Sequence, residues 1–183
     1  NSSPKPRSIR WSLRLFLLVI TVCGVTVGLH LRRVAERKQV IATLTRLSPS
    51  ATRVLVEYDY QIGVDGYPIP KAKSMVPAPL LDLAGHEFFH EIVGVNLDSE
   101  RVSVSDLESL KALRQLKRLD LEYNQLSSEC FEAIASLEDL TRLDLQETGI
   151  TDADASCVAS LTDLQILLLS GNGLSDQCFD HMK

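Results

Sequence analysis

Residues 116–126 read Leu116-Lys-Arg-Leu119-Asp-Leu121-Glu-Tyr-Asn124-Gln-Leu126, and the spacing of their apolar residues returns along the chain. The pattern recurs 24 residues later at Leu140, Leu143, Leu145 and Ile150, and once more at Leu164, Leu167, Leu169 and Leu174. The position of Asn124 is taken by Thr148 and Asn172 in these copies. A looser copy precedes them at Ile92, Val95, Leu97 and Val102. Because several positions agree in every copy, residues 92–183 form an internal repeat.

Each copy predicts a short strand, a turn and a helical return segment. Alternate strand side chains point inward, and the return segments add apolar residues at helical spacing: Phe131, Ile134 and Leu137; Ala155, Val158 and Leu161; Phe179 and Met182. One copy cannot enclose its own apolar face, so we expect neighbouring copies to stack. The polar residue after each strand is expected to hydrogen-bond backbone groups that the turn leaves unpaired.

The pattern resembles the leucine-rich repeat, whose template is L-x-x-L-x-L-x-x-N/C-x-L. Gly149-Ile150-Thr151-Asp152-Ala153 and Gly173-Leu174-Ser175-Asp176 are similar to the return of bacterial 24-residue leucine-rich repeats. The resemblance implies a curved-sheet scaffold for protein interaction, and it does not imply a catalytic activity or a known ligand. This chain departs from it at Asp154-Ala155 and at Glu100. We therefore predict an α/β fold: a leucine-rich-repeat solenoid of about four repeats with an N-terminal α/β cap and a single transmembrane helix.

In such a solenoid, the outward strand residues form a concave binding face. The candidate protein-binding residues are Arg118, Asp120, Glu122, Arg142, Asp144, Gln146, Ile166, Leu168 and Ser170. Arg118 and Arg142 are expected to pair with the aspartates of neighbouring strands. Ile166 and Leu168 are expected to be exposed as an apolar patch at the open C-terminal repeat. This patch predicts a missing repeat, self-association or contact with another protein.

The N-terminal region predicts a membrane anchor. Residues 1–10 form a basic tail expected to be disordered, and residues 11–31 predict a transmembrane helix that contacts lipid, with no charge between Leu15 and Leu29. A cleaved signal peptide is the alternative, but no small-x-small site follows the apolar core. Residues 32–47 continue as an amphipathic juxtamembrane helix. We expect a single-pass protein with its N-terminus inside and its repeats extracytoplasmic.

Residues 48–91 predict a strand, a loop and a capping helix. The strand covers Arg53 to Tyr60, with Val54, Val56, Tyr58 and Tyr60 on one face, and a Gly/Pro-rich loop spans 61–79. Residues 79–83 and 88–89 are expected to form an amphipathic helix that covers the end of the repeats.

The segment His86-Glu87-Phe88-Phe89-His90 is a literal H-E-x-x-H. On a helix this motif places two imidazoles on one face and supplies a glutamate as general base, so the alternative function is a membrane-bound zinc metallopeptidase. A catalytic zinc needs a third protein ligand, and the candidate is Glu108, which follows the motif in the sequence. We prefer a structural interpretation, with His86, Glu87 and His90 facing solvent and no bound metal or cofactor. No Ser/His/Asp arrangement is evident in the sequence.

Charge and cysteine content exclude other classes. Residues 1–50 carry nine Lys/Arg and one Glu, whereas residues 92–183 carry seven Lys/Arg and seventeen Asp/Glu. The folded part is therefore acidic, and no nucleic-acid partner is expected. Cys130, Cys157 and Cys178 lie on return segments and are expected to be buried thiols.

Overall fold

The computed structural model describes residues 13–47, 55–62, 69, 72–98 and 101–181. One mixed sheet forms the centre of the fold, with strands in the order β1-β2-β3-β4-β5. These are β1 (Leu55–Tyr58), β2 (Ile92–Asn96), β3 (Arg118–Asp120), β4 (Arg142–Asp144) and β5 (Ile166–Leu168). Strand β1 pairs antiparallel with β2, and each later pair is parallel.

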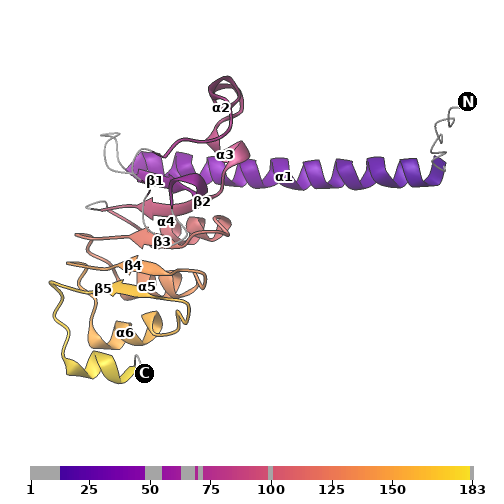
Figure 1. Ribbon diagram of the computed structural model, residues 1–183. Coiled ribbons are helices and arrows are strands. Elements are labelled where there is room, and N and C mark those ends of the chain that lie inside the picture. Colours follow the sequence, from indigo (N-terminus) through magenta and orange to yellow (C-terminus); the bar gives the residue numbers. More distant parts are fainter. Residues whose placement is uncertain (1–12, 48–54, 63–68, 70–71, 99–100, 182–183) are drawn as a thin grey trace, which may run out of the picture.

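Short helices return the chain behind each parallel strand (Figure 1). They are α4 (Val104–Ser109) with η2 (Leu110–Ala112), then α5 (Ser128–Ala135), α6 (Asp152–Val158) and η3 (Asp176–His181). The inward leucines of β3 and β4 are fully buried against the predicted return residues Phe131, Ile134 and Val158. Leucine periodicity thus places the core between the sheet and the helices. The side chains of Phe179 and Met182 lie outside the described residues.

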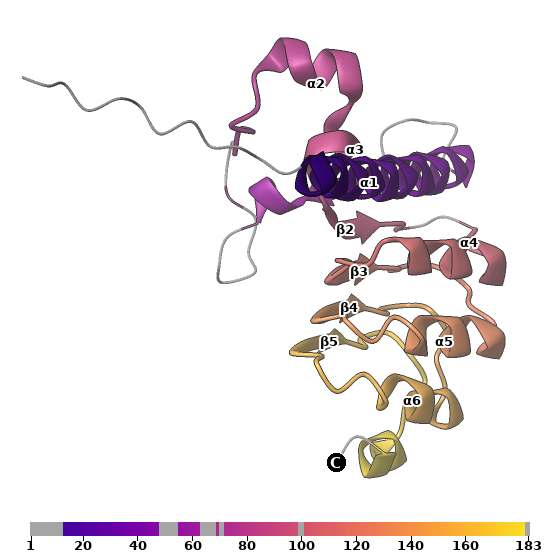
Figure 2. The ribbon, with the colours of Figure 1, turned by 90° about the vertical axis from the view of Figure 1, so that its right-hand side faces the viewer.

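The first helix, α1 (Leu13–Leu47), is continuous for 35 residues and changes its environment halfway. Apolar residues between Leu15 and Leu31 are exposed, whereas Val34, Arg37, Val40 and Leu44 are buried. Their spacing of three to four residues puts them on one helix face, which packs on the first unit of the sheet (Figures 1 and 2). By length and composition, α1 is the one helix of the described residues able to cross a membrane.

The sheet is therefore capped by α1 and β1, and our prediction that residues 79–83 and 88–89 form one helix covering the end of the repeats is wrong. Two separate helices form there, α2 (Ala78–Ala84) and α3 (His86–Phe89), and neither contains a buried residue. Gly85 separates them at φ 86°, a backbone angle that suits glycine. The predicted strand also ends early: Tyr60 lies in the 3₁₀ helix η1 (Asp59–Gln61), and Val54 lies outside the described residues.

Candidate functional site

The strand register aligns the candidate binding residues in columns. Gly94, Arg118, Arg142 and Ile166 are successive partners, and so are Asn96, Asp120, Asp144 and Leu168. We call this surface, together with Asp98, Glu122, Gln146 and Ser170, the open sheet face. It lies on the side of the sheet away from the return helices (Figure 2). One expectation about it is wrong: Ile166 and Leu168 are half-buried rather than exposed. Asp144 is also buried, with 5% of its surface exposed.

The charge pairing on this face differs from the predicted Arg–Asp bridges. Arg118 Nη1 lies 3.3 Å from Glu57 Oε2 on β1, while its Nε makes no hydrogen bond to any described residue. The Glu57 side chain crosses Gly94, where an added Cβ would lie 2.2 Å from Oε2. Glycine at this position leaves room for the Glu57 side chain to reach the first arginine. Sequence reasoning missed Glu57, because the antiparallel pairing of β1 is not visible in the repeat.

The acidic residues beside these arginines crowd one another. Asp120 accepts hydrogen bonds from Asn96 Nδ2 (3.0 Å) and from the Glu122 amide (3.1 Å). Burial, opposed by the Glu122 amide and reinforced by the neighbouring carboxylates, raises the pKa of Asp120. Carboxylate oxygens of Asp120, Glu122 and Asp144 lie within 4.8 Å of one another, and this is the group among the described residues that could hold a cation. The cluster offers carboxylate oxygens alone, without His or Cys, and oxygen ligands of this kind suit a hard cation.

The polar residues after each strand serve the fold, as predicted. Asn124 Nδ2 donates to the carbonyls of Leu97 and Leu121, at 2.9 and 2.8 Å. Asn172 Nδ2 repeats this pattern two repeats later, with the carbonyls of Leu145 and Leu169, and Thr148 Oγ1 donates to the Leu145 carbonyl. Asp154, where the chain departs from the usual repeat sequence, also has a structural role. Its carboxylate accepts hydrogen bonds from the Thr151 amide and hydroxyl, which completes a capping box at the start of α6.

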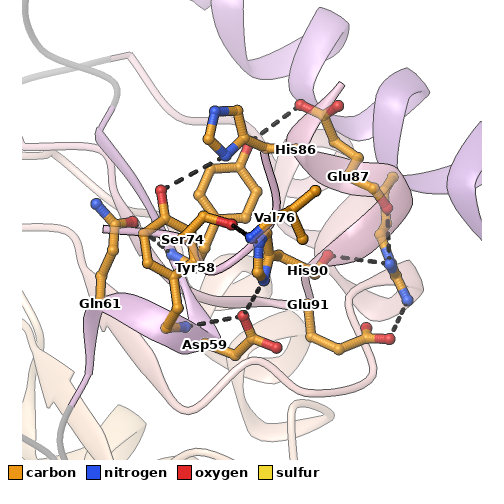
Figure 3. Close-up of polar contacts among 11 residues, drawn as sticks. Tyr58, Asp59, Gln61, Ser74, Val76, His86, Glu87, His90 and Glu91 are labelled. Carbon is orange, nitrogen blue, oxygen red and sulfur yellow. Dashed lines mark hydrogen bonds and ion pairs between the residues drawn. The ribbon is translucent and has the colours of Figure 1, made fainter. Parts of the chain in front are cut away.

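The H-E-x-x-H segment forms α3 and the residue after it (Figure 3). We expected His86, Glu87 and His90 to face solvent, but all three are half-buried. Only 11% of the His90 side chain is exposed, and Glu87 accepts a 2.9 Å hydrogen bond from the Tyr58 hydroxyl. Burial and the Glu87 carboxylate together raise the pKa of Tyr58. The Tyr58 and His86 rings stack with their centroids 5.2 Å apart. Glu108, the candidate third zinc ligand, is exposed on α4.

Both ring nitrogens of His90 have protein partners, so neither is open to a zinc ion in this arrangement. Nδ1 lies 2.9 Å from Asp59 Oδ1, and Nε2 lies 2.7 Å from Ser74 Oγ (Figure 3). Asp59 accepts from Nδ1–H, so Nε2 is left to accept from the Ser74 hydroxyl. The structure thus brings together a Ser–His–Asp chain that the sequence did not reveal. The Val76 amide also donates to Ser74 Oγ at 3.0 Å. Because Ser74 bonds both to its own loop and to His90, we interpret the Ser74–His90–Asp59 network as holding the loop around Ser74 against the end of α3.

Arg37 connects this network to α1. Its Nη1 donates to the carbonyls of Glu87 (2.9 Å) and His90 (3.1 Å), and its Nη2 pairs with the Glu91 carboxylate. The guanidinium is nearly fully buried, so the long helix and the cap are joined by charged hydrogen bonds as well as by packing.

The return cysteines are free thiols in the structure. Cys130 and Cys178 are buried as expected, whereas Cys157 is only half-buried.

Comparison with known proteins agrees with the repeat geometry. A search of curated proteins finds no match to this chain. Two leucine-rich-repeat family models match it, one over residues 115–137 and the other over 137–159. These ranges include β3, α5, β4 and α6, with their buried leucines and their polar residues after the strands. The chain therefore contains leucine-rich repeats across residues 115–159.

Proposed function

We propose that this chain is a single-pass membrane protein whose leucine-rich repeats bind another protein and catalyse no reaction. The division of α1 carries the proposal: its residues 15–29 are uncharged and exposed, while one face of the following turns is buried against the rest of the fold. A helix that is apolar on all sides is stable in a bilayer rather than in water. Following the predicted orientation, the repeats are extracytoplasmic.

The open sheet face supports the protein-binding part of the proposal. Its second arginine, Arg142, forms no ion pair with any described residue, and Arg118 keeps a hydrogen-bond donor free. Both line a shallow depression with Glu57, Asn96 and Asp120. Charged groups that are imperfectly paired in the free protein gain partners when a complementary surface covers them. We expect the partner to present acidic groups to the arginines and basic groups to Asp120 and Glu122.

Membrane attachment is tested by fractionating cells that express the full chain. The wild-type chain is expected in the membrane pellet after an alkaline carbonate wash. Val19→Arg combined with Val22→Arg should release it, because each arginine would sit within the apolar stretch. Tyr123→Arg, at a residue exposed on the repeats, is the matched control and should stay in the pellet. Release of the wild-type chain by carbonate would refute the anchor.

Protein binding is tested by placing a photo-crosslinking amino acid at Arg142 on the open sheet face. The same group at Glu132, exposed on α5, is the matched control. A discrete adduct formed from position 142 and not from 132 supports the proposal. A homodimer adduct would identify self-association, and equal labelling from both positions would reject the open sheet face as the interface.

A further inference from the structure

The helices α2 and α3 project from the cap beside α1, at the point where α1 leaves the folded part (Figures 1 and 2). They cover no part of the repeat core, and neither has a buried residue. Their exposed apolar side chains therefore need another explanation. Leu83 is 84% exposed, Leu80 47% and Phe89 36%, and Met75 in the preceding loop is 99% exposed.

Three side chains of α1 hold α2 and α3 against it. His30 Nε2 lies 2.9 Å from the Phe88 carbonyl, and the two rings meet edge to face with centroids 4.9 Å apart. Further along α1, Arg37 donates to the carbonyls of Glu87 and His90, and Lys38 Nζ donates to Ala84 at the end of α2. The two short helices are thus held at the level of residues 30–38.

Helix geometry relates this level to a bilayer. A hydrocarbon core about 30 Å thick needs about 20 helical residues at about 1.5 Å each. Counted from Leu13, where α1 begins, such a span ends near Arg32. His30 then lies at the edge of the hydrocarbon, and α3, which contacts it, lies in the headgroup layer. The exposed Arg32, at the end of this span, suits the phosphates of anionic lipids.

We propose that α2 and α3 form a second membrane contact, in which Leu80, Leu83 and Phe89 insert into the headgroup layer of an anionic bilayer. The proposal rests on the membrane anchoring proposed above and extends it. A single helix would let the repeats rotate and tilt freely. Insertion at a second point holds the repeats at one angle to the membrane, so the open sheet face is presented in one direction.

The test uses tryptophan fluorescence in vesicles of equal parts phosphatidylcholine and phosphatidylglycerol, with bromine on the lipid acyl chains. The full chain carries Trp11→Phe to remove its single native tryptophan. One tryptophan is then introduced as Leu83→Trp, as Phe16→Trp for a position in the apolar stretch, or as Tyr123→Trp for a position on the repeats. All three positions are exposed, so none of the changes disturbs the core.

The expected result is a graded one. Emission from Leu83→Trp shifts to the blue and loses intensity on brominated lipid, to an extent between those of Phe16→Trp and Tyr123→Trp. Emission from Leu83→Trp that matches Tyr123→Trp, in chains that float with the vesicles, overturns the second contact alone. Chains that do not float with the vesicles overturn the anchor and the second contact together.

Discussion

The replacement Arg37→Met tests whether α1 is part of the folded repeat domain. Methionine keeps much of the side-chain length and its apolar contacts but removes every donor. Two backbone carbonyls, of Glu87 and His90, lose a charged donor, and Glu91 loses its partner. A hydrogen bond to a charged group contributes about 1.5–3 kcal/mol, so we expect a loss of about 3–5 kcal/mol in the free energy of unfolding. Glu91 adds little, because 40% of its side chain is exposed.

The matched control is Arg32→Met, the same change a little more than one turn earlier on the same helix. Arg32 pairs with Glu36 at 3.0 Å, but 78% of its side chain is exposed. Its loss should cost less than about 0.5 kcal/mol. Urea unfolding in detergent micelles, followed by circular dichroism, measures both variants. Hydrogen exchange should show lost protection in α3 and β1 and unchanged protection in β4. Equal costs for the two variants would refute the coupling of α1 to the cap.

Three further predictions concern the repeats. Leu143→Ala, at a side chain with 0% exposure, should lower the free energy of unfolding by about 3 kcal/mol in urea titrations. Asp120→Asn should raise the urea midpoint at pH 7, and this gain should vanish at pH 3. The sign follows from the raised pKa of Asp120. As the pH rises, Asp120 loses its proton in the unfolded chain before it does so in the folded chain. Above the ordinary carboxyl pKa, the Asp120 carboxylate therefore lowers the free energy of unfolding. Gly94→Val should displace Glu57 from Arg118 and reduce hydrogen-exchange protection in β1, since the new Cβ overlaps Glu57 Oε2.

Each of these predictions has a result that would contradict it. Leu83→Ala, at an exposed leucine, should leave stability unchanged, and a loss equal to that of Leu143→Ala would argue against the assigned core. For Asp120, a gain that persists at pH 3 would show that charge is not the cause. For Gly94, unchanged protection in β1 would show that Glu57 is free to move aside.

Some predictions succeeded because they concern contacts that repeat at a fixed interval. Leu119 and Leu143 are buried one strand apart because both obey the same periodicity, and Asn124 and Asn172 make equivalent hydrogen bonds. The N-terminal part has no such repetition. The sequence did not show that Arg37 would be buried, or that Asp59, Ser74 and His90 would meet from three separate segments.

Local pattern alone determined the repeat, its strand register and the apolar stretch of α1, since alternation and constant spacing leave leucines one way to leave water. Tertiary structure alone decided the rest. The buried half of α1 covers the first unit, β1 brings Glu57 across Gly94 to Arg118, and α2 stays outside the core. Which segments cover the end of the sheet depends on contacts between residues far apart in the chain, and a local sequence pattern does not show those contacts.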